Sequence, residues 1–181
     1  NISASNQTRG LVYGGNGSPA NTAQVDFFTI ATAGNAADFG DASSATALQP
    51  GSGSSTTRAL FAGGYIAPGP CFNNVDAITV ETQGNTIDFN NLTASKCGGY
   101  GCADRTRAIY AGGRVSTTPG GSSTNDITSC TISIQNDFVN QSDLTASKAF
   151  GTGFSSATRA VFAGLAVPAY DNTIDFTNIQ S

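Results

Sequence analysis

One short phrase occurs four times along the chain. It reads TRGLVYGG, TRALFAGG, TRAIYAGG and TRAVFAGL, and its copies begin at residues 8, 57, 106 and 158. The arginines of these copies, Arg9, Arg58, Arg107 and Arg159, are 49, 49 and 52 residues apart. A near-constant period of this length is typical of proteins that repeat one supersecondary unit. The period limits the possible folds more than any other feature of the sequence.

The similarity between the copies extends well beyond this phrase. A variable loop and then an alternating segment follow each copy: VDFFTIAT (25–32), VDAITVET (75–82), ITSCTISI (127–134) and IDFTNIQS (174–181). An Asp-Phe unit comes next in three copies: NAADFGD (35–41), NTIDFNN (85–91) and the shorter NDFVNQ (136–141). The next Thr-Arg is then reached through SATALQPGSG (44–53), TASKCGGYGC (93–102) or TASKAFGTGF (145–154). Each repeat therefore contains four kinds of segment in a constant order.

These segments predict β-strands. The alternating segments are rich in β-branched and aromatic residues and are bounded by Gly and Asn, which is typical of strands. The apolar run after each Thr-Arg is too short for a helix, and a Gly pair closes it in three of the four copies. That Gly pair would let the strand end in a turn with positive φ. We therefore predict an all-β protein with about four short strands per repeat.

Four strands in about 50 residues is the size of a β-propeller blade, and an apolar run closed by Gly-Gly resembles the kelch repeat. The resemblance implies a kelch-like β-propeller of roughly 49-residue blades, about 3.5 to 4 of them, in a single domain over 1–181. Asp and Phe stand where kelch repeats carry Tyr and Trp. In this wording the repeats are similar to those of structural proteins of tailed phages, and that similarity implies a virion protein.

The ends of the chain fall inside the repeat. We predict units of approximately 1–42, 43–92, 93–144 and 145–181, with the TASK segment as first strand of each. Residues 1–7 are too few for that strand, and the chain stops where the last strand of the fourth unit would begin. Either the ring closes on itself with one worn blade, or the array continues through further polypeptide or a neighbouring copy. An exposed strand edge recruits other strands, which favours assembly with neighbours.

The repeated side chains allow an architectural and a functional interpretation. A ring of arginines could bind an anion or a sugar acid. One position repeated in every blade favours architecture, with each Arg packed inside or between blades and paired to a repeated carboxylate, because a guanidinium binds carboxylate in a bidentate fork. The carboxylates in question are Asp26, Asp76 and Asp175. We also expect three aromatic residues to fill the space between sheets: Phe39, Phe89 and Phe138.

The composition argues against several classes of function. The chain has no His and only 11 % charged residues, and its net charge is −4 with eight basic residues. Nucleic-acid binding needs clustered Lys and Arg, and a bilayer span needs roughly 20 apolar residues, so neither is expected. Without His, and with carboxylates spread at repeat spacing, we predict no catalytic residue, no metal site, no cofactor and no enzymatic activity.

Two further sets of residues have alternative interpretations. Cys71, Cys97, Cys102 and Cys130 could form disulfides or remain buried thiols. The variable loops at 16–23, 65–74, 114–125 and 166–170 should emerge on one rim, where recognition usually occurs. Three aromatic residues of these loops could stack on sugar rings: Tyr65, Phe72 and Tyr170. The alternative, which we favour, is that the segments are spacer loops or contacts to the next subunit.

From these features we expect a structural protein of an extracellular assembly. The first choice is a virion appendage or surface that acts through oligomerisation and adhesion. The alternatives are a glycan-binding, lectin-like propeller and a subunit of a non-viral extracellular filament. The expected partners are further copies of the chain or other virion or filament proteins, with surface glycans as the partner in the lectin alternative, and the expected location is extracellular or on a virion.

Overall fold

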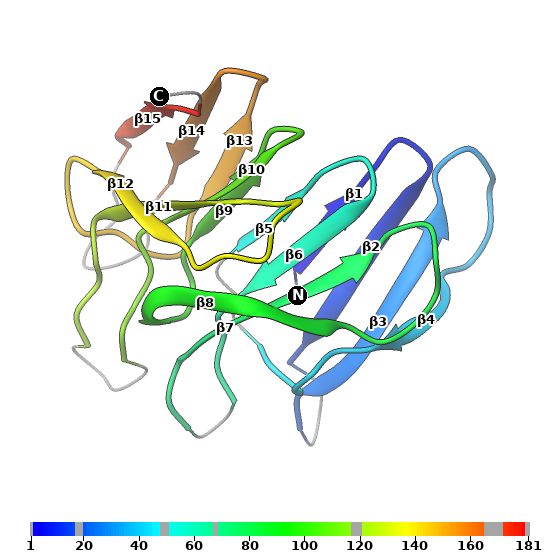
Figure 1. The fold of residues 1–181 in the computed structure, drawn as a ribbon. Helices are drawn as coiled ribbons and strands as arrows, with labels where there is room; N and C mark the ends of the chain where they lie inside the picture. The colour runs from blue at the N-terminus through cyan, green and yellow to red at the C-terminus, as the bar shows by residue number, and fades with distance from the viewer. Residues whose placement is uncertain are drawn as a thin grey trace.

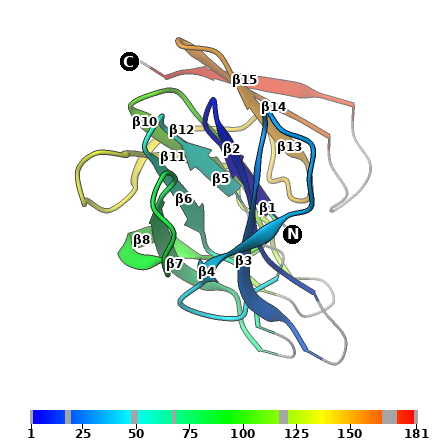
Figure 2. The ribbon, with the colours of Figure 1, turned by 90° about the vertical axis from the view of Figure 1, so that its right-hand side faces the viewer.

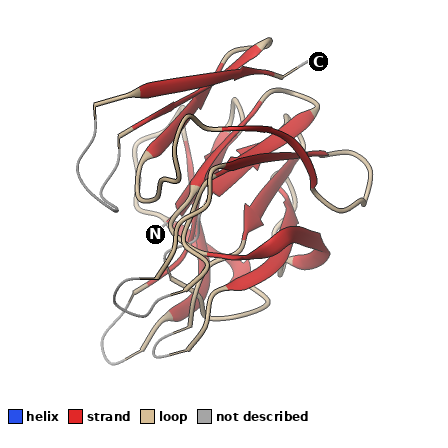
Figure 3. Ribbon diagram, turned by 90° about the vertical axis from the view of Figure 1, so that its left-hand side faces the viewer, coloured by secondary structure: helices blue, strands red, loops and turns tan. Residues whose placement is uncertain are grey.

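The structure is a computed structural model that describes residues 2–16, 20–47, 51–66, 69–116, 121–164 and 172–179. Within these ranges the protein is all-β, as predicted, and its strands form four antiparallel sheets (Figures 1 and 3). Sheet 1 contains β1 (Ile2–Ser5), β2 (Arg9–Gly15), β3 (Thr22–Thr29) and β4 (Ala37–Asp41). Sheet 2 contains β5 (Gly51–Ser54), β6 (Arg58–Ala62), β7 (Phe72–Thr79) and β8 (Ile87–Lys96). Sheet 3 contains β9 (Tyr100–Ala103), β10 (Arg107–Ala111), β11 (Asp126–Thr131) and β12 (Val139–Asp143), and sheet 4 contains β13 (Thr152–Ser155), β14 (Arg159–Ala163) and β15 (Ile174–Asn178).

The Thr-Arg phrase marks the exit from the first turn of each sheet. In sheet 1 the Asn6 side-chain oxygen accepts hydrogen bonds from the backbone N–H groups of Thr8 and Arg9, at 2.9 and 2.8 Å. The same turn is closed by Ser55, Asp104 and Ser156 in the other three sheets. Short polar side chains of this kind stabilise a turn by satisfying its backbone donors. The repeated phrase therefore begins where a hairpin turn ends.

The Gly pairs that close three of the apolar runs have the positive φ that the sequence predicts. Gly63 has a φ of 61° and Gly64 a φ of 112°, values that residues with a Cβ rarely adopt. In this conformation the Gly63 N–H binds the Asn74 carbonyl and the Gly64 N–H binds the Lys96 carbonyl. The pair thus ends β6 and anchors it to β7 and to the end of β8.

The four sheets follow one another along the chain with their first strands side by side (Figures 1 and 2). The contacts run from β1 to β5, from β5 to β9 and from β9 to β13. Glycines allow the close approach, since a Cβ on Gly101 would lie 2.3 Å from the Gly51 Cα. Serine hydroxyls bridge the strands: Ser54 Oγ donates to the Ser5 carbonyl at 2.7 Å and Ser155 Oγ to the Ala103 carbonyl at 2.5 Å.

Each pair of consecutive sheets encloses its own core. We call the face of a sheet that carries the Thr-Arg arginine its forward face, the opposite face its rear face, and the contact of a forward face with the next rear face a seam. In the first seam the forward face of sheet 1 meets the rear face of sheet 2, and the Tyr13 ring stacks on Phe61 with centroids 4.4 Å apart. Leu11 also lies in this first core, and Leu60 and Ile109 occupy its register position in the cores of the second and third seams.

The prediction that the first repeat is incomplete is wrong. Residues Ile2–Ser5 form β1 and pair with Tyr13 to Gly10, so sheet 1 has four strands. The first strand is only four residues long in every sheet, and it lies just before the turn, not in the TASK segment. TASK at 93–96 is instead the end of β8, the last strand of sheet 2. The fourth sheet contains three strands among the described residues.

The three Asp-Phe units do not occupy equivalent positions. Phe39, Phe89 and Phe138 are all buried, and all three lie in cores between sheets. In sheet 2, however, Asp88 pairs with Asp76, whereas in sheet 3 the equivalent residue is Asn140, which pairs with Thr128. Phe138 therefore precedes β12 and packs back into the second seam, on the side of sheet 2.

Replacing Gly101 by Ala should destabilise the protein by about 1–3 kcal/mol, since a Cβ at that position would overlap the Gly51 backbone and push β5 and β9 apart. Urea unfolding measured by circular dichroism would show the loss. The matched control is Gly34→Ala, because a Cβ on Gly34 meets no atom within 4 Å. Equal stability of the two variants would contradict the close packing of β5 on β9.

Candidate functional site: the arginine seams and the uncovered faces

The repeated arginines join consecutive sheets. Arg9 Nη1 donates to the Val80 carbonyl at 3.1 Å, Arg58 Nη1 to the Ile132 carbonyl at 2.9 Å and Arg107 Nη1 to the Ile179 carbonyl at 2.9 Å. The three acceptors occupy one register position, because the N–H of each binds the Thr carbonyl of the phrase in its own sheet. Each seam is thus closed by a half-buried charged donor on a backbone carbonyl, a stronger bond than one between neutral groups.

Aromatic rings lie against three of the four repeated guanidinium groups. The Arg9 guanidinium lies 5.0 Å from the centroid of Phe27, and that of Arg58 lies 5.6 Å from the centroid of Phe89. Arg159 has the same arrangement, 4.7 Å from the centroid of Phe176. A planar guanidinium stacks on such a ring and keeps its N–H groups free to donate at the edge.

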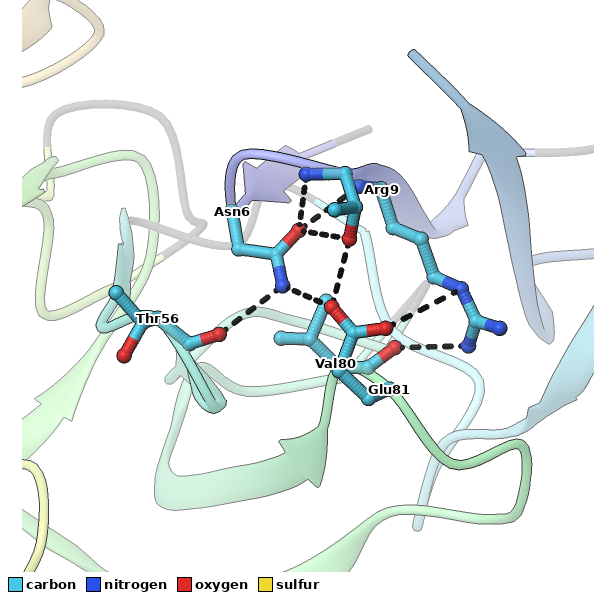
Figure 4. A network of polar contacts seen from close by, with 6 residues as sticks. Asn6, Arg9, Thr56, Val80 and Glu81 are labelled. Carbon is cyan, nitrogen blue, oxygen red and sulfur yellow. Dashed lines mark hydrogen bonds and ion pairs between the residues drawn. The ribbon is translucent and has the colours of Figure 1, made fainter. Parts of the chain in front are cut away.

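The first seam has an additional polar network around Glu81 (Figure 4). Glu81 Oε1 accepts hydrogen bonds from Thr8 Oγ1 at 2.6 Å and from Asn6 Nδ2 at 2.5 Å. Arg9 Nε lies 3.9 Å from Glu81 Oε2. Asn6 Nδ2 also donates to the Thr56 carbonyl at 3.0 Å. The hydrogen bonds from Thr8 and Asn6, and then the charge of Arg9, hold the pKa of the Glu81 carboxyl below its ordinary value of 4.5. The turn of sheet 1 is thereby tied to the end of β7.

The predicted pairing of the arginines with repeated aspartates is not what the structure shows. The buried Asp76 carboxylate accepts from Tyr13 Oη at 2.6 Å and from Ser43 and Thr86, and Asp26 accepts from Gln24. The reason is strand alternation: Asp26 pairs with Val12, three residues from Arg9, so its side chain lies on the opposite face of the sheet. This alternation of side chains between the two faces of the sheet could have been predicted from the sequence.

Two lysines of the TASK segments are the buried cations that the sequence reasoning missed. Lys148 Nζ donates to Asp175 Oδ2 at 2.7 Å, and Lys96 pairs in the same way with Asp126. Burial alone would raise the pKa of the Asp175 carboxyl, but the hydrogen bonds from Lys148 and Thr145 outweigh it, so that this pKa lies below the ordinary 3.8. The exact repetition of TASK was the available signal.

The cysteines divide into one disulfide and two buried thiols. Cys71 and Cys97 form a disulfide with their Cα atoms 5.5 Å apart, which joins the segment before β7 to the segment after β8. Cys102 and Cys130 are free and buried, and burial raises the pKa of each thiol to about 12. A thiol with such a pKa stays protonated and is a poor nucleophile.

The predicted rim residues are only partly placed by the structure. Tyr65 and Phe72 are half-buried, and the Tyr65 backbone forms bridges with Ala47 and Cys71. Tyr170 lies outside the described residues. The described parts of the connections β2–β3, β6–β7 and β10–β11 leave the sheets toward the lower edge of Figure 1. Tyr65 therefore lies in the β6–β7 connection, whereas Phe72 is the first residue of β7.

The four Thr-Arg turns come together at one open cavity of about 360 Å³. It is lined by equivalent residues of the four turns, among them Asn6, Ser55, Asp104 and Ser156, and by Arg105. The side chains of the first four are occupied in closing their own turns. In the described ranges, no three Cys, Asp or Glu side chains are grouped to hold a metal ion. The same residues include no helix that is long and apolar enough to cross a membrane.

The two ends of the row of sheets are uncovered. On the forward face of sheet 4 the exposed fractions of Phe154, Ile174 and Phe176 are 55 %, 68 % and 61 %. On the rear face of sheet 1 those of Phe28 and Ile30 are 43 % and 51 %. Contiguous apolar patches of this kind are typical of interaction surfaces. The structure therefore offers two candidate contact surfaces, one at each end.

No protein-family model and no curated protein matches this sequence. The resemblance to kelch repeats and to phage structural proteins thus remains a prediction from the repeated phrases.

Replacing Arg58 by Ala should lower the free energy of unfolding by roughly 1–2 kcal/mol, because it removes a charged hydrogen-bond donor and a stacked ring contact from the second seam. Urea unfolding at pH 7 would measure the change. Arg105→Ala removes the same charge from an exposed turn and should alter stability by less than about 0.5 kcal/mol. Similar losses in both variants would show that the seam bond adds nothing.

The Lys148–Asp175 pair should make the free energy of unfolding depend on pH in the acidic range. Because the pKa of Asp175 is lower in the folded protein than its ordinary 3.8, the stabilisation is complete above that value and is lost as pH falls below it. Urea unfolding between about pH 6 and pH 2.5 would show the decline in the free energy of unfolding. Lys148→Gln should be less stable at neutral pH and should show a shallower decline, whereas Arg105→Gln should follow the wild type. A Lys148→Gln curve parallel to the wild type would contradict the role of the pair.

Proposed function

We propose that this protein is a non-enzymatic structural component of an extracellular assembly, with a virion appendage or surface as first choice. Its sheets act as blades of a kelch-like propeller, and it works through contact with neighbouring subunits. Such a role requires a rigid, repeated architecture and adhesive surfaces. It requires no reactive group.

The order of the strands supports the blade interpretation. In a propeller, the first strand of each blade lies nearest the axis and successive blades pack face to face. Here β1, β5, β9 and β13 lie side by side, and the forward face of each sheet packs on the rear face of the next. The four turns meet at one cavity, as blade turns do near a common axis.

The uncovered forward face of sheet 4 is the observation that carries the structural role. Its residues Phe154, Ile174 and Phe176 are more than half exposed, whereas the residues at the same register positions in sheets 1 to 3 are largely buried in seams. A monomer would leave this apolar surface in water, and a subunit of an assembly would bury it. The disulfide between Cys71 and Cys97 supports an oxidising, extracellular location.

Immunogold electron microscopy would test the proposal. An antibody raised against the purified chain should label the tails or surface of virus particles released from its source. Label on bare filaments would support the non-viral alternative. The lectin alternative would be supported instead by specific binding of the purified protein to a glycan array together with an absence of label on any particle, and that result would overturn the structural role.

A further inference from the structure

The forward face of sheet 4 has every part of a seam except a partner. Phe154, Val161 and Phe176 lie in one cross-strand row, equivalent by register to Cys102, Ile109 and Ser129 of sheet 3. Those three residues of sheet 3 are buried, and Cys102 and Ile109 belong to the third core. Arg159 occupies the position of Arg107 and is already stacked on Phe176, but it is exposed. We call this face of sheet 4, with Arg159 and its apolar row, the donor surface.

The rear face of sheet 1, which we call the acceptor surface, has the complementary residues. By register, Val12, Phe28 and Ile30 are equivalent to Phe61, Ile78 and Val80 of sheet 2, all of which are buried in the first seam. The equivalence of Ile30 to Val80 is fixed by its backbone, because the Ile30 N–H binds the Thr8 carbonyl as the Val80 N–H binds that of Thr57. The Ile30 carbonyl thus occupies the position at which the other three sheets accept an arginine.

We propose that a second copy of this chain docks the rear face of its sheet 1 on the forward face of sheet 4, forming a fourth seam between molecules. In that seam Arg159 donates to the Ile30 carbonyl of the second copy, and Phe154, Ile174 and Phe176 cover its Phe28 and Ile30. This inference rests on the proposed function and deepens it by naming the partner and both surfaces.

We choose a second copy as the partner because its sheet 1 carries the complementary half of the seam, and the described parts of sheets 1 and 4 do not contact each other within one copy. Sheets 1 and 4 lie at opposite ends of the row, and both surfaces remain exposed (Figure 1). The contact is heterologous, since a donor surface binds a different acceptor surface. Such contacts either close into a ring of copies or continue as a filament.

Complementation between two blocked variants tests this docking. Phe176→Asp places a charge on the donor surface, and Phe28→Asp places one on the acceptor surface. Both side chains are substantially exposed, so the folds should survive, which circular dichroism and urea unfolding would verify. In analytical ultracentrifugation the wild type should associate, each variant alone should associate at least about 30-fold more weakly, and an equimolar mixture should form dimers, since one intact surface of each kind remains.

The controls separate a specific seam from general stickiness. Arg159→Ala should weaken association by about tenfold or more, while Arg105→Ala should not. Ile134→Asp alters an equally exposed apolar residue away from both surfaces and should leave association unchanged.

Each alternative result overturns the docking in a distinguishable way. Association that persists in both blocked variants, or a mixture that stays monomeric, overturns the head-to-tail seam and leaves the proposed structural function in place. A wild type that is monomeric at all concentrations, with its apolar surfaces still reactive to a hydrophobic dye, overturns the seam and removes the main support for assembly.

Discussion

The bond from an arginine to a backbone carbonyl of the next sheet is the interaction on which the rest of this structure depends. Each sheet here has only three or four short strands, too small a unit to bury both of its faces alone. Arg9, Arg58 and Arg107 fix where the next sheet lies, and the apolar residues of each forward face then meet a rear face in register. The cores are consequences of that alignment.

Charge in this protein is used almost entirely for position. The guanidinium groups of Arg9, Arg58 and Arg107 lie at the seams. The ammonium groups of Lys96 and Lys148 lie buried against aspartates at the connections between sheets: Asp126 and Asp175. A buried ion pair adds little net stability relative to apolar packing, but losing one partner is costly. In a chain with so few charged residues, these pairs serve to specify which connection sits beside which strand.

Sequence reasoning predicted the class of fold and the repeat but misplaced its boundaries. Period and strand propensity identified an all-β chain, because those signals are local. The four-residue strand Ile2–Ser5 was missed because such a segment has no periodicity to read, and its pairing with β2 is decided by the turn at Asn6. The partners of Asp76 and the displaced register of Phe138 depend on which face meets which sheet, and only packing decides that. The uncovered faces of sheets 1 and 4 could not be predicted from the sequence for the same reason.

The acceptor in every seam belongs to the main chain, and this has a consequence for how such proteins change. A side-chain acceptor can be lost by one substitution, whereas the carbonyls of Val80, Ile132 and Ile179 persist whatever residue occupies the position. A duplicated unit therefore arrives with its attachment point intact and needs only its own arginine to join the row. Duplication or deletion of a unit can therefore lengthen or shorten such a row without removing the acceptor of any remaining seam.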